Sequence, residues 1–310
     1  MDSTLGLHAF PRTPVALAGA ILLAGLATCS GGSAPSVDAP SVDVPTWPSE
    51  LTVSTCDGYT SVTVGSYVVQ SNYWNRSNCP GTQCMEINNA TAAFAVTQGP
   101  NACGDTVASY PNVLYGCSFG NCSPASMLPM PVSALSTVTS SWDFTVGASA
   151  HDDYDVAYDI WFCPDNHCGA NGFPGGLEVM IWLDYNIAHG WKTHLGSVTV
   201  SGYNWDVWEA PLGGANHSWT YLIYLIRPPM VTSVTNLDLN AFFQDAAARG
   251  YVQDSWYLYA IQAGDELRTG GVPFINNSFS VSINGVTPVT ATTPHDGSSG
   301  DGGLPDGPDL

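Results

Sequence analysis

The segment of residues 177–183 (LEVMIWL) combines a carboxylate with large apolar side chains in the alternating pattern of a β-strand. Side chains on a strand point alternately to its two faces, so Glu178, Met180 and Trp182 share one face and the aliphatic residues share the other. The aliphatic face is ordinary core. The other face offers an acid beside flat apolar surface, which the floor of a sugar-binding groove requires. The alternative is a half-exposed sheet face with no such role.

Two further segments each predict a strand that carries one carboxylate. In residues 158–162 (YDIWF), Asp159 shares a face with a tryptophan. In residues 256–266 (WYLYAIQAGDE), Glu266 falls on the same face as Gln262. Three predicted strands therefore each present one acid next to aromatic or amide side chains.

Acids placed in this way predict the chemistry of glycosidic-bond hydrolysis. One carboxylate must be ionised, and a second must be protonated so that it can donate a proton to the leaving oxygen. Only five of the 26 acidic residues are Glu, so Glu178 and Glu266 are the prominent candidates for the pair. A third acid such as Asp159 can separate the pKa values of the pair by hydrogen bonding and charge repulsion.

The rest of the chain is rich in predicted strands. Only residues 239–249 predict a helix, with Asp238 as the N-cap and Gly250 just after the C-terminus. Many strands and one short helix predict an all-β fold, a two-sheet antiparallel β-sandwich. Alternating apolar residues between turn clusters predict strands at residues 61–70, 156–162, 178–184, 195–200, 219–226, 256–262 and 279–283.

Composition excludes several classes of partner. The 310 residues contain only 6 Lys and Arg, and the formal net charge is −20. A nucleic-acid-binding protein or a polybasic membrane-surface protein needs many more basic residues to neutralise phosphates. Because 45% of the residues are hydrophobic, the chain as a whole is not disordered.

The ends of the chain predict export. The apolar run VALAGAILLAGLA has the length of a signal sequence and is too short for a membrane span. The run ends in LATC, which resembles a bacterial lipobox, so lipidation of Cys29 and ordinary signal cleavage are both open. We expect a signal peptide at 1–28, a Ser/Pro/Asp-rich linker at 29–49, one domain at 50–285 and a disordered Gly/Asp/Pro-rich tail at 286–310.

Eight cysteines remain after Cys29, an even number that predicts up to four disulfides in an exported chain. Two pairs close short loops, Cys117–Cys122 and Cys163–Cys168. A zinc site is the alternative, but the chain lacks CxxC spacing. The other four, Cys56, Cys79, Cys84 and Cys103, allow three pairings.

Together these residues resemble glycoside hydrolase family 12, the compact jelly-roll endoglucanases. The resemblance covers roughly residues 52–284 and follows the order of the family's motifs. The matching segments are 71–75 (SNYWN), 115–122 (YGCSFGNC), 158–162, 177–183, 202–208 (GYNWDVW) and 256–266.

The resemblance implies a role for each matching residue. Glu178 resembles the nucleophile, Glu266 the acid/base, and Asp159 the auxiliary carboxylate that hydrogen-bonds to the nucleophile. The implied substrate-binding residues are Asn72 and Trp74 at a donor-side subsite, Met180 and Trp182 on the groove floor, and Gln262 in the Gln-x-Gly-x-Glu motif. Cys56 with Cys84 matches a bridge of the bacterial members, which leaves Cys79 with Cys103 as an additional pair.

Three features depart from the family pattern. Asp265 replaces an uncharged residue, and it faces away from Glu266 unless Gly264 introduces a bulge. Arg268 occupies a position where bacterial members often carry an aromatic residue. Residues 189–196 (HGWKTHLG) replace a proline-rich loop that borders the acceptor side, which leaves the preferred glucan open.

The resemblance therefore implies a secreted retaining endo-β-1,4-glucanase acting on cellulose-like, mixed-linkage or xyloglucan chains. The alternatives are a xyloglucan-specific endoglucanase or transglycosylase of the same fold, and a non-catalytic glycan-binding jelly roll. We expect a β-glucan substrate, no cofactor, no metal, no nucleic acid and no protein partner. We also expect a monomer that contacts a membrane only if Cys29 is lipidated.

Overall fold

The computed structural model describes residues 42–100, 103, 106–149, 152–169, 172–187, 192–210 and 219–289. All of these belong to one compact unit, Ala39–Leu310. The expected signal peptide, most of the linker and nearly all of the tail lie outside the described residues. Within the described part, no helix combines the length and the apolar character needed to cross a bilayer.

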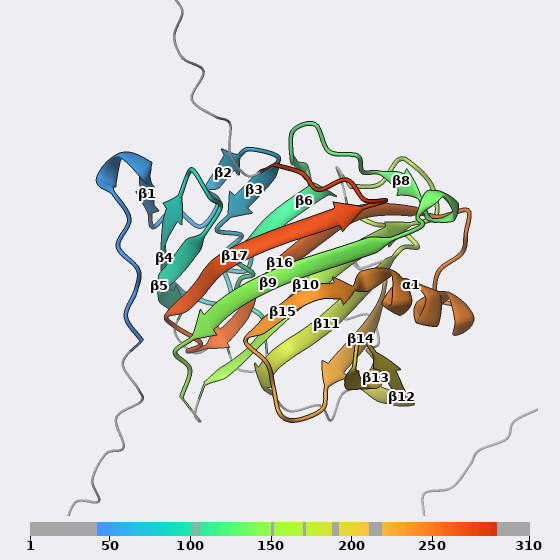
Figure 1. Ribbon diagram of the computed structural model, residues 1–310. Coiled ribbons are helices and arrows are strands. Elements are labelled where there is room, and N and C mark those ends of the chain that lie inside the picture. Colours follow the sequence, from blue (N-terminus) through green and yellow to red (C-terminus); the bar gives the residue numbers. More distant parts are fainter. Residues whose placement is uncertain are drawn as a thin grey trace, which may run out of the picture. The chain divides into compact units, whose positions relative to one another are not determined.

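Two β-sheets form the body of the molecule, and their strands are almost all antiparallel (Figure 1). The smaller sheet has the order β1 (Thr52–Thr55), β4 (Gly81–Asn88), β5 (Phe94–Pro100), β17 (Phe274–Ile283), β9 (Val138–Val146), β15 (Ser233–Asp238). The larger sheet has the order β12 (Thr193–Val200), β13 (Tyr203–Ala210), β14 (Thr220–Ile226), β11 (Leu177–Asn186), β10 (Asp153–Cys163), β16 (Tyr257–Thr269), β6 (Asn112–Ser118), β3 (Tyr67–Gln70), β2 (Ser61–Val64). Short strands β7 (Asn121–Cys122) and β8 (Met130–Pro131) pair with β6 and β16. The predicted all-β sandwich is confirmed.

The core fills the space between the sheets, as the alternation of the strands requires. Tyr158 on β10 packs against Trp142 on β9 with ring centroids 4.9 Å apart, and its hydroxyl lies 3.0 Å from that of Ser140. Val179 and Ile181 of β11 belong to the same core and are fully buried. Full burial of side chains of this size stabilises the fold by roughly 1.5–3 kcal/mol each. The sheets are therefore held face to face along β9 and β10.

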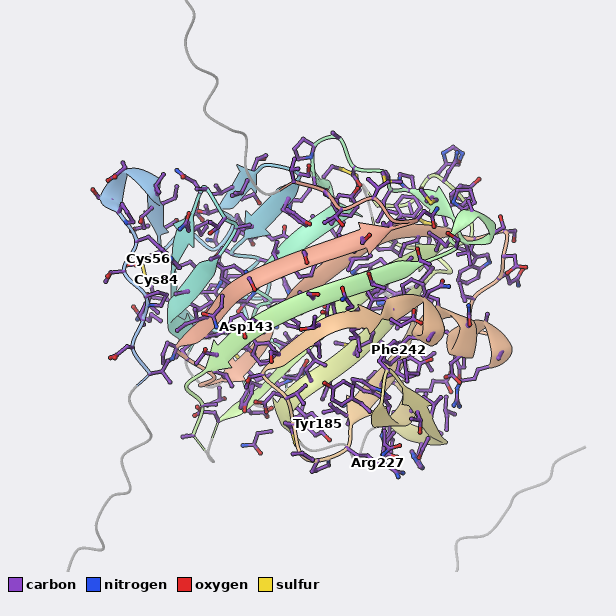
Figure 2. All side chains as sticks on the ribbon, viewed as in Figure 1. Cys56, Cys84, Asp143, Tyr185, Arg227 and Phe242 are labelled. Atoms are coloured by element: carbon purple, nitrogen blue, oxygen red, sulfur yellow. A yellow bond between two sulfur atoms is a disulfide. The ribbon has the colours of Figure 1, made fainter. Side chains whose placement is uncertain are left out.

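The predicted helix is α1 (Leu239–Ala248), which closes one end of the sandwich (Figures 1 and 2). The side chain of Asp238 accepts a hydrogen bond from the backbone N–H of Ala241, as an N-cap does. Phe242 packs edge-on against Trp205 with centroids 5.0 Å apart. Two 3-10 turns, Ser49–Leu51 and Val132–Ala134, are the other helical segments among the described residues.

One predicted strand is wrong. Residues 61–70 form a β-hairpin of β2 and β3 instead of a single strand. Gly65 adopts a positive φ of 58° at the turn, a conformation that a glycine adopts without steric cost. Gly65 and Ser66 interrupt the alternation, and the core-facing positions change from Val64 to Tyr67 and Val69, which a single strand does not allow.

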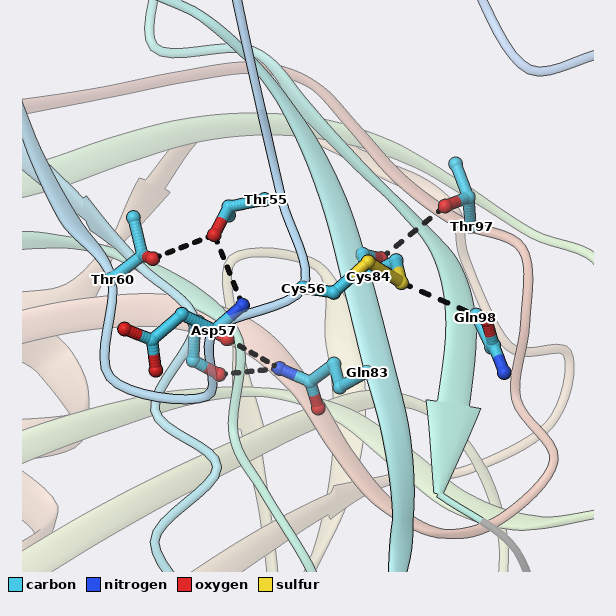
Figure 3. Close-up of a disulfide and its surroundings, with 9 residues drawn as sticks. Thr55, Cys56, Asp57, Thr60, Gln83, Cys84, Thr97 and Gln98 are labelled. Carbon is cyan, nitrogen blue, oxygen red and sulfur yellow. Dashed lines mark hydrogen bonds between the residues drawn. A yellow bond between two sulfur atoms is a disulfide. The ribbon is translucent and has the colours of Figure 1, made fainter.

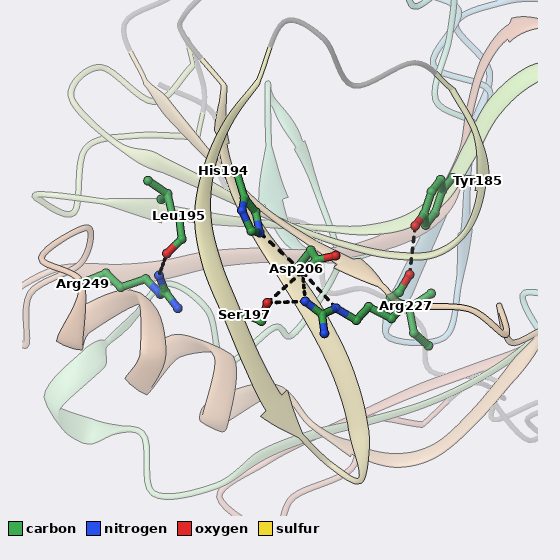
Figure 4. Close-up of polar contacts among 8 residues, drawn as sticks. Tyr185, His194, Leu195, Ser197, Asp206, Arg227 and Arg249 are labelled. Carbon is green, nitrogen blue, oxygen red and sulfur yellow. Dashed lines mark hydrogen bonds and ion pairs between the residues drawn. The ribbon is translucent and has the colours of Figure 1, made fainter.

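The outer edge of the larger sheet is fixed by a polar cluster on β12 and β13 (Figure 4). Arg227 donates to Oδ1 of Asp206 at 2.6 Å and to the hydroxyl of Ser197 at 2.6 Å. The imidazole of His194 lies 3.4 Å from the same Asp206 oxygen. Of the segment 189–196, the residues from Thr193 onward belong to β12, and residues 189–191 lie outside the described part.

Candidate active site

The candidate site lies on the outer face of the larger sheet, where β10 runs between β11 and β16. On β10, Asp159 stands opposite Gln262 of β16 and Asp155 stands opposite Glu266. Glu178 of β11 stands opposite a β10 residue two positions from Asp159. Because the positions on β10 differ by even numbers, all of these side chains share the face that points away from the core.

A cleft of about 440 Å³ opens over these strands. It brings together the predicted residues Glu178, Glu266, Asp159 and Gln262 from the sheet, and Asn72 and Trp74 from the segment after β3. The other lining residues are Tyr59, Gln70, Tyr110, Ser118, Phe119, Asn121, Trp161, Trp219 and Tyr221. The cleft therefore combines three acids with seven aromatic side chains.

Glu178 is buried and held by two neighbours. The indole Nε1 of Trp219 donates to its Oε2 at 2.9 Å, and its carboxyl is hydrogen-bonded to that of Asp159. Burial, followed by the negative charge of Glu266, raises the pKa of Glu178 well above its ordinary value, while both hydrogen bonds act to lower it. Burial and the charge of Glu178 raise the pKa of Asp159, and their shared hydrogen bond raises it further. The shared hydrogen bond thus raises the pKa of Asp159 and lowers that of Glu178, so it favours the proton on Asp159 over Glu178.

Glu266 is the more accessible acid, with 15% of its side chain exposed. Its Oε2 lies 2.8 Å from Nη2 of Arg268, which is itself buried. The negative charge of Glu266 acts on Glu178 and on Asp159, so the three acids form one electrostatic cluster.

An amide network supports the floor of the cleft. Nε1 of Trp161 donates to Oε1 of Gln262 at 2.8 Å, and Nε2 of Gln262 donates to Oδ1 of Asn112 at 3.2 Å. Gln70 also donates to Asn112, at 3.0 Å, and accepts from Asn121 at 2.9 Å. Gln262 is therefore oriented by its neighbours.

Asn72 and Trp74 belong to the segment after β3, and both line the cleft. The indole of Trp74 is 49% exposed, so its face is available to a ligand instead of being packed in the core. Asn72 has a positive φ of 43° and its carbonyl accepts from the N–H of Tyr110 at 3.1 Å, which fixes the segment beside the sheet.

Met180 and Trp182, predicted on the groove floor, are not among the residues that line this cleft. They share a face with Glu178 but are 3% and 1% exposed, in an apolar cluster with residues of β13 and β14. Nζ of Lys192 lies 4.1 Å from the centre of the Trp182 ring. Burial lowers the pKa of this lysine to about 8. Alternation placed these side chains on the correct face but did not show that neighbouring strands cover them.

Asp265 faces the interior of the sandwich. The register between β10 and β16 is regular through Gly264, so no bulge turns Asp265 toward the cleft. The side chain is fully buried, and neither carboxyl oxygen has a hydrogen-bond partner among the described residues. Burial raises the pKa of Asp265 well above its ordinary value.

Several lining residues were not predicted from the sequence. Phe119 lies between two disulfide-bonded cysteines and packs edge-on against Trp161 and Trp219, with centroids 5.5 and 5.9 Å apart. Trp219 directly precedes β14, which pairs in parallel with β11, and this pairing brings it to Glu178. The aromatic content of these segments was visible in the sequence, but their contact with the acids was not.

The cystine pairs in the structure are Cys56–Cys84, Cys79–Cys103, Cys117–Cys122 and Cys163–Cys168, the same four pairs given above. Figure 3 shows Cys56–Cys84, which ties the segment after β1 to β4. Among the described residues, one close group of metal-ligand types occurs, Cys163, Asp165 and Cys168. Its two sulfurs form a disulfide, so they are not free to bind a metal.

A two-sheet sandwich with an aromatic cleft and a cluster of strand-borne carboxylates defines a glycoside hydrolase. The model of glycosyl hydrolase family 12 matches residues 65–284, and the chain belongs to this family, whose members are retaining glycoside hydrolases.

Similar solved structures and related proteins agree with this assignment. Endoglucanase Cel12A from Rhodothermus marinus is 36% identical, with a TM-score of 0.67 over 74% of this chain and 98% of that one. Xyloglucan-specific endo-β-1,4-glucanase A from Aspergillus niger is 25% identical over 74% of this chain and 90% of its own length. A probable cellulase, Cel12b, from Mycobacterium tuberculosis is 28% identical over 51% of this chain and 97% of its own.

Proposed function

We propose that this protein is a retaining endo-β-1,4-glucanase that cleaves internal linkages of neutral β-glucans by double displacement. The observation that carries the proposal is the arrangement of Glu178 and Glu266 in one cleft, with Asp159 hydrogen-bonded to Glu178. A glycan-binding protein without activity has no need for three buried or half-buried acids, since burying ionisable groups costs free energy.

In the first step, Glu178 attacks the anomeric carbon and the bond from that carbon to the leaving oxygen breaks. Glu266 gives its proton to that oxygen, so the departing chain leaves as an alcohol. In the second step, Glu266 takes a proton from water, and the resulting hydroxide attacks the glycosyl–Glu178 ester. Glu178 returns as a carboxylate, and the anomeric configuration is retained because the carbon is inverted twice.

The surroundings of each acid fit its role. Trp219 donates to Glu178, and the shared proton on Asp159 also stabilises negative charge there, so Glu178 suits a nucleophile. Glu266 is the more exposed acid, which suits a group that exchanges its proton with water.

The substrate is an uncharged polysaccharide, because a chain of net charge −20 would repel acidic glycans. Affinity would come from stacking on exposed rings such as Trp74 and from hydroxyl hydrogen bonds. The xyloglucan-specific relatives favour xyloglucan as an alternative preferred substrate.

The test is hydrolysis of soluble mixed-linkage β-glucan, xyloglucan and a cellulose derivative by wild type, Glu178→Gln and Glu266→Gln. We expect Glu178→Gln to lose at least about 10³-fold in kcat on every substrate. Glu266→Gln should lose about 10²- to 10⁴-fold on polysaccharide but far less on a dinitrophenyl β-cellobioside, whose leaving group needs no proton.

Proton NMR of the first products should show the β-anomer. Initial release of the α-anomer would exclude retention, and substantial activity of Glu178→Gln would exclude this residue as the nucleophile. The initial rates of the wild type on xyloglucan and mixed-linkage glucan would decide between the two substrate preferences.

Export of the protein is part of the same proposal. Four disulfides in one domain support an oxidising compartment, since reducing compartments keep thiols free. We further propose cleavage or lipidation at Cys29, a flexible linker and tail, and a monomeric catalytic domain at 50–285. Metabolic labelling with a fatty acid, compared between the wild type and Cys29→Ser, would separate lipidation from plain cleavage.

A further inference from the structure

Arg268 forms a buried ion pair with two carboxylates on the face of the larger sheet that carries the cleft. Its Nη1 lies 2.7 Å from Oδ2 of Asp155, and its Nη2 lies 2.8 Å from Oε2 of Glu266. Arg268 is 3% exposed and Asp155 is fully buried. A charged group of this kind is held in one orientation, because withdrawing either partner would leave an unpaired charge inside the protein.

The strand register explains why a cation is required here. Asp155 on β10 stands directly opposite Glu266 on β16, and like charges in this position repel each other. Arg268 follows Glu266 by two residues, so it occupies the same face and its guanidinium reaches both acids. Burial and the charge of Glu266 raise the pKa of Asp155, whereas Arg268 acts to lower it.

We propose that Arg268 is a positioning residue for Glu266 and that Asp155 anchors Arg268. This inference rests on the proposed role of Glu266 as the acid/base. The guanidinium can only donate, and the carbonyl oxygen of a protonated carboxyl is the better acceptor, so the contact at Oε2 favours the catalytic proton on Oε1. Oε2 of Glu266 therefore binds Arg268, and Oε1 is left to give its proton to the leaving oxygen.

The contact also affects both half-reactions. When Glu266 gives up its proton, the new carboxylate is stabilised by a charge-assisted hydrogen bond that is already in place. In the second step, the same hydrogen bond holds the Glu266 carboxylate in place while it takes a proton from water.

Ionisable groups of several elements surround Glu266, and all of them except Arg268 and Asp155 stay unchanged in the test. They come from β10, β11, β14, β16 and the segments before β6 and β12. They are Asp155, Asp159, Glu178, Tyr221, Asp265, Arg268, Tyr110 and Lys192.

The test compares Arg268→Met, Arg268→Lys and Asp155→Asn with the wild type, on soluble β-glucan and on dinitrophenyl β-cellobioside. Arg268→Met should lose roughly 10- to 100-fold in kcat on β-glucan with little change in KM. Its loss on the activated glycoside should be smaller, because that leaving group needs no proton. Arg268→Lys should recover most of the loss on β-glucan, and Asp155→Asn should give an intermediate loss.

Arg227→Met is the matched control, because Arg227 forms an exposed ion pair far along the sheet and should leave rate and pH profile unchanged. A wild-type rate of Arg268→Met on β-glucan would overturn the proposal. Equal losses on both substrates would also overturn it and indicate a structural role. If Arg268→Met does not fold, Arg268→Lys and Asp155→Asn give the same readouts. Absence of hydrolysis by the wild type would instead refute the proposed function.

Discussion

The indole Nε1 of Trp219 donates a 2.9 Å hydrogen bond to Oε2 of Glu178. The two residues are 41 positions apart, and the parallel pairing of β11 with β14 brings them together. A donor in this position stabilises the ionised carboxylate, which is the form that attacks the substrate.

Removing this donor should therefore impair the nucleophile. Trp219→Phe keeps an aromatic ring but loses the N–H, and we expect kcat/KM to fall roughly 10- to 100-fold. The hydrogen bond lowers the pKa of Glu178, so its loss raises that pKa and moves the acid limb of the rate profile to higher pH. A pH–rate profile with an unchanged acid limb would contradict this account.

Trp74 should contribute to substrate binding. Trp74→Ala removes the 49%-exposed indole from the cleft, and we expect KM to rise about 10-fold with kcat little changed. Trp74→Phe keeps a stacking surface and should recover most of the affinity. If the alanine variant binds β-oligosaccharides as tightly as wild type does in calorimetry, this ring is not part of a subsite.

Asp265 should make stability depend on pH. The pKa of Asp265 is higher in the folded protein than in the unfolded chain. Its contribution to stability is therefore fully present below the unfolded-state pKa and is lost as pH rises through the folded-state pKa. The free energy of unfolding of Asp265→Leu, relative to that of the wild type, should thus increase as pH rises. At pH 8 the variant should be more stable by roughly 1–3 kcal/mol. Urea unfolding between pH 4 and pH 8 measures the difference.

The matched control for Asp265 is the exposed Asp254, whose conversion to Asn should leave the pH dependence as it is. A stability difference between Asp265→Leu and wild type that stays constant over this pH range would contradict the prediction.

The Cys56–Cys84 disulfide should stabilise the fold without affecting catalysis. It closes a loop with a sequence separation of 28, which restricts the unfolded chain and contributes about 2–4 kcal/mol. The double variant Cys56→Ala/Cys84→Ala should lower the free energy of unfolding by that amount, while kcat at 25 °C stays near the wild-type value. An unchanged urea midpoint would show that the bridge does not act in this way.

The sequence predicted the fold class and the location of the acids, because both depend on local alternation. Because side chains alternate along a strand, the sequence predicted that Glu178 and Asp159 lie on the faces where the structure has them. The same rule predicted that Glu266 lies on the face of Gln262 and that Asp265 points into the core. The helix was also predicted, since its cap and its apolar face are local features.

Only the tertiary structure decided which of these side chains meet and which are covered. Met180 and Trp182 share the face of Glu178 but are buried by β13 and β14, whose positions periodicity does not specify. Arg268 was visible as a departure from the family pattern, yet its contact with Asp155 depends on the register between two strands about one hundred residues apart. Side-chain direction is a property of one strand, whereas burial, hydrogen bonding and charge pairing are properties of its neighbours.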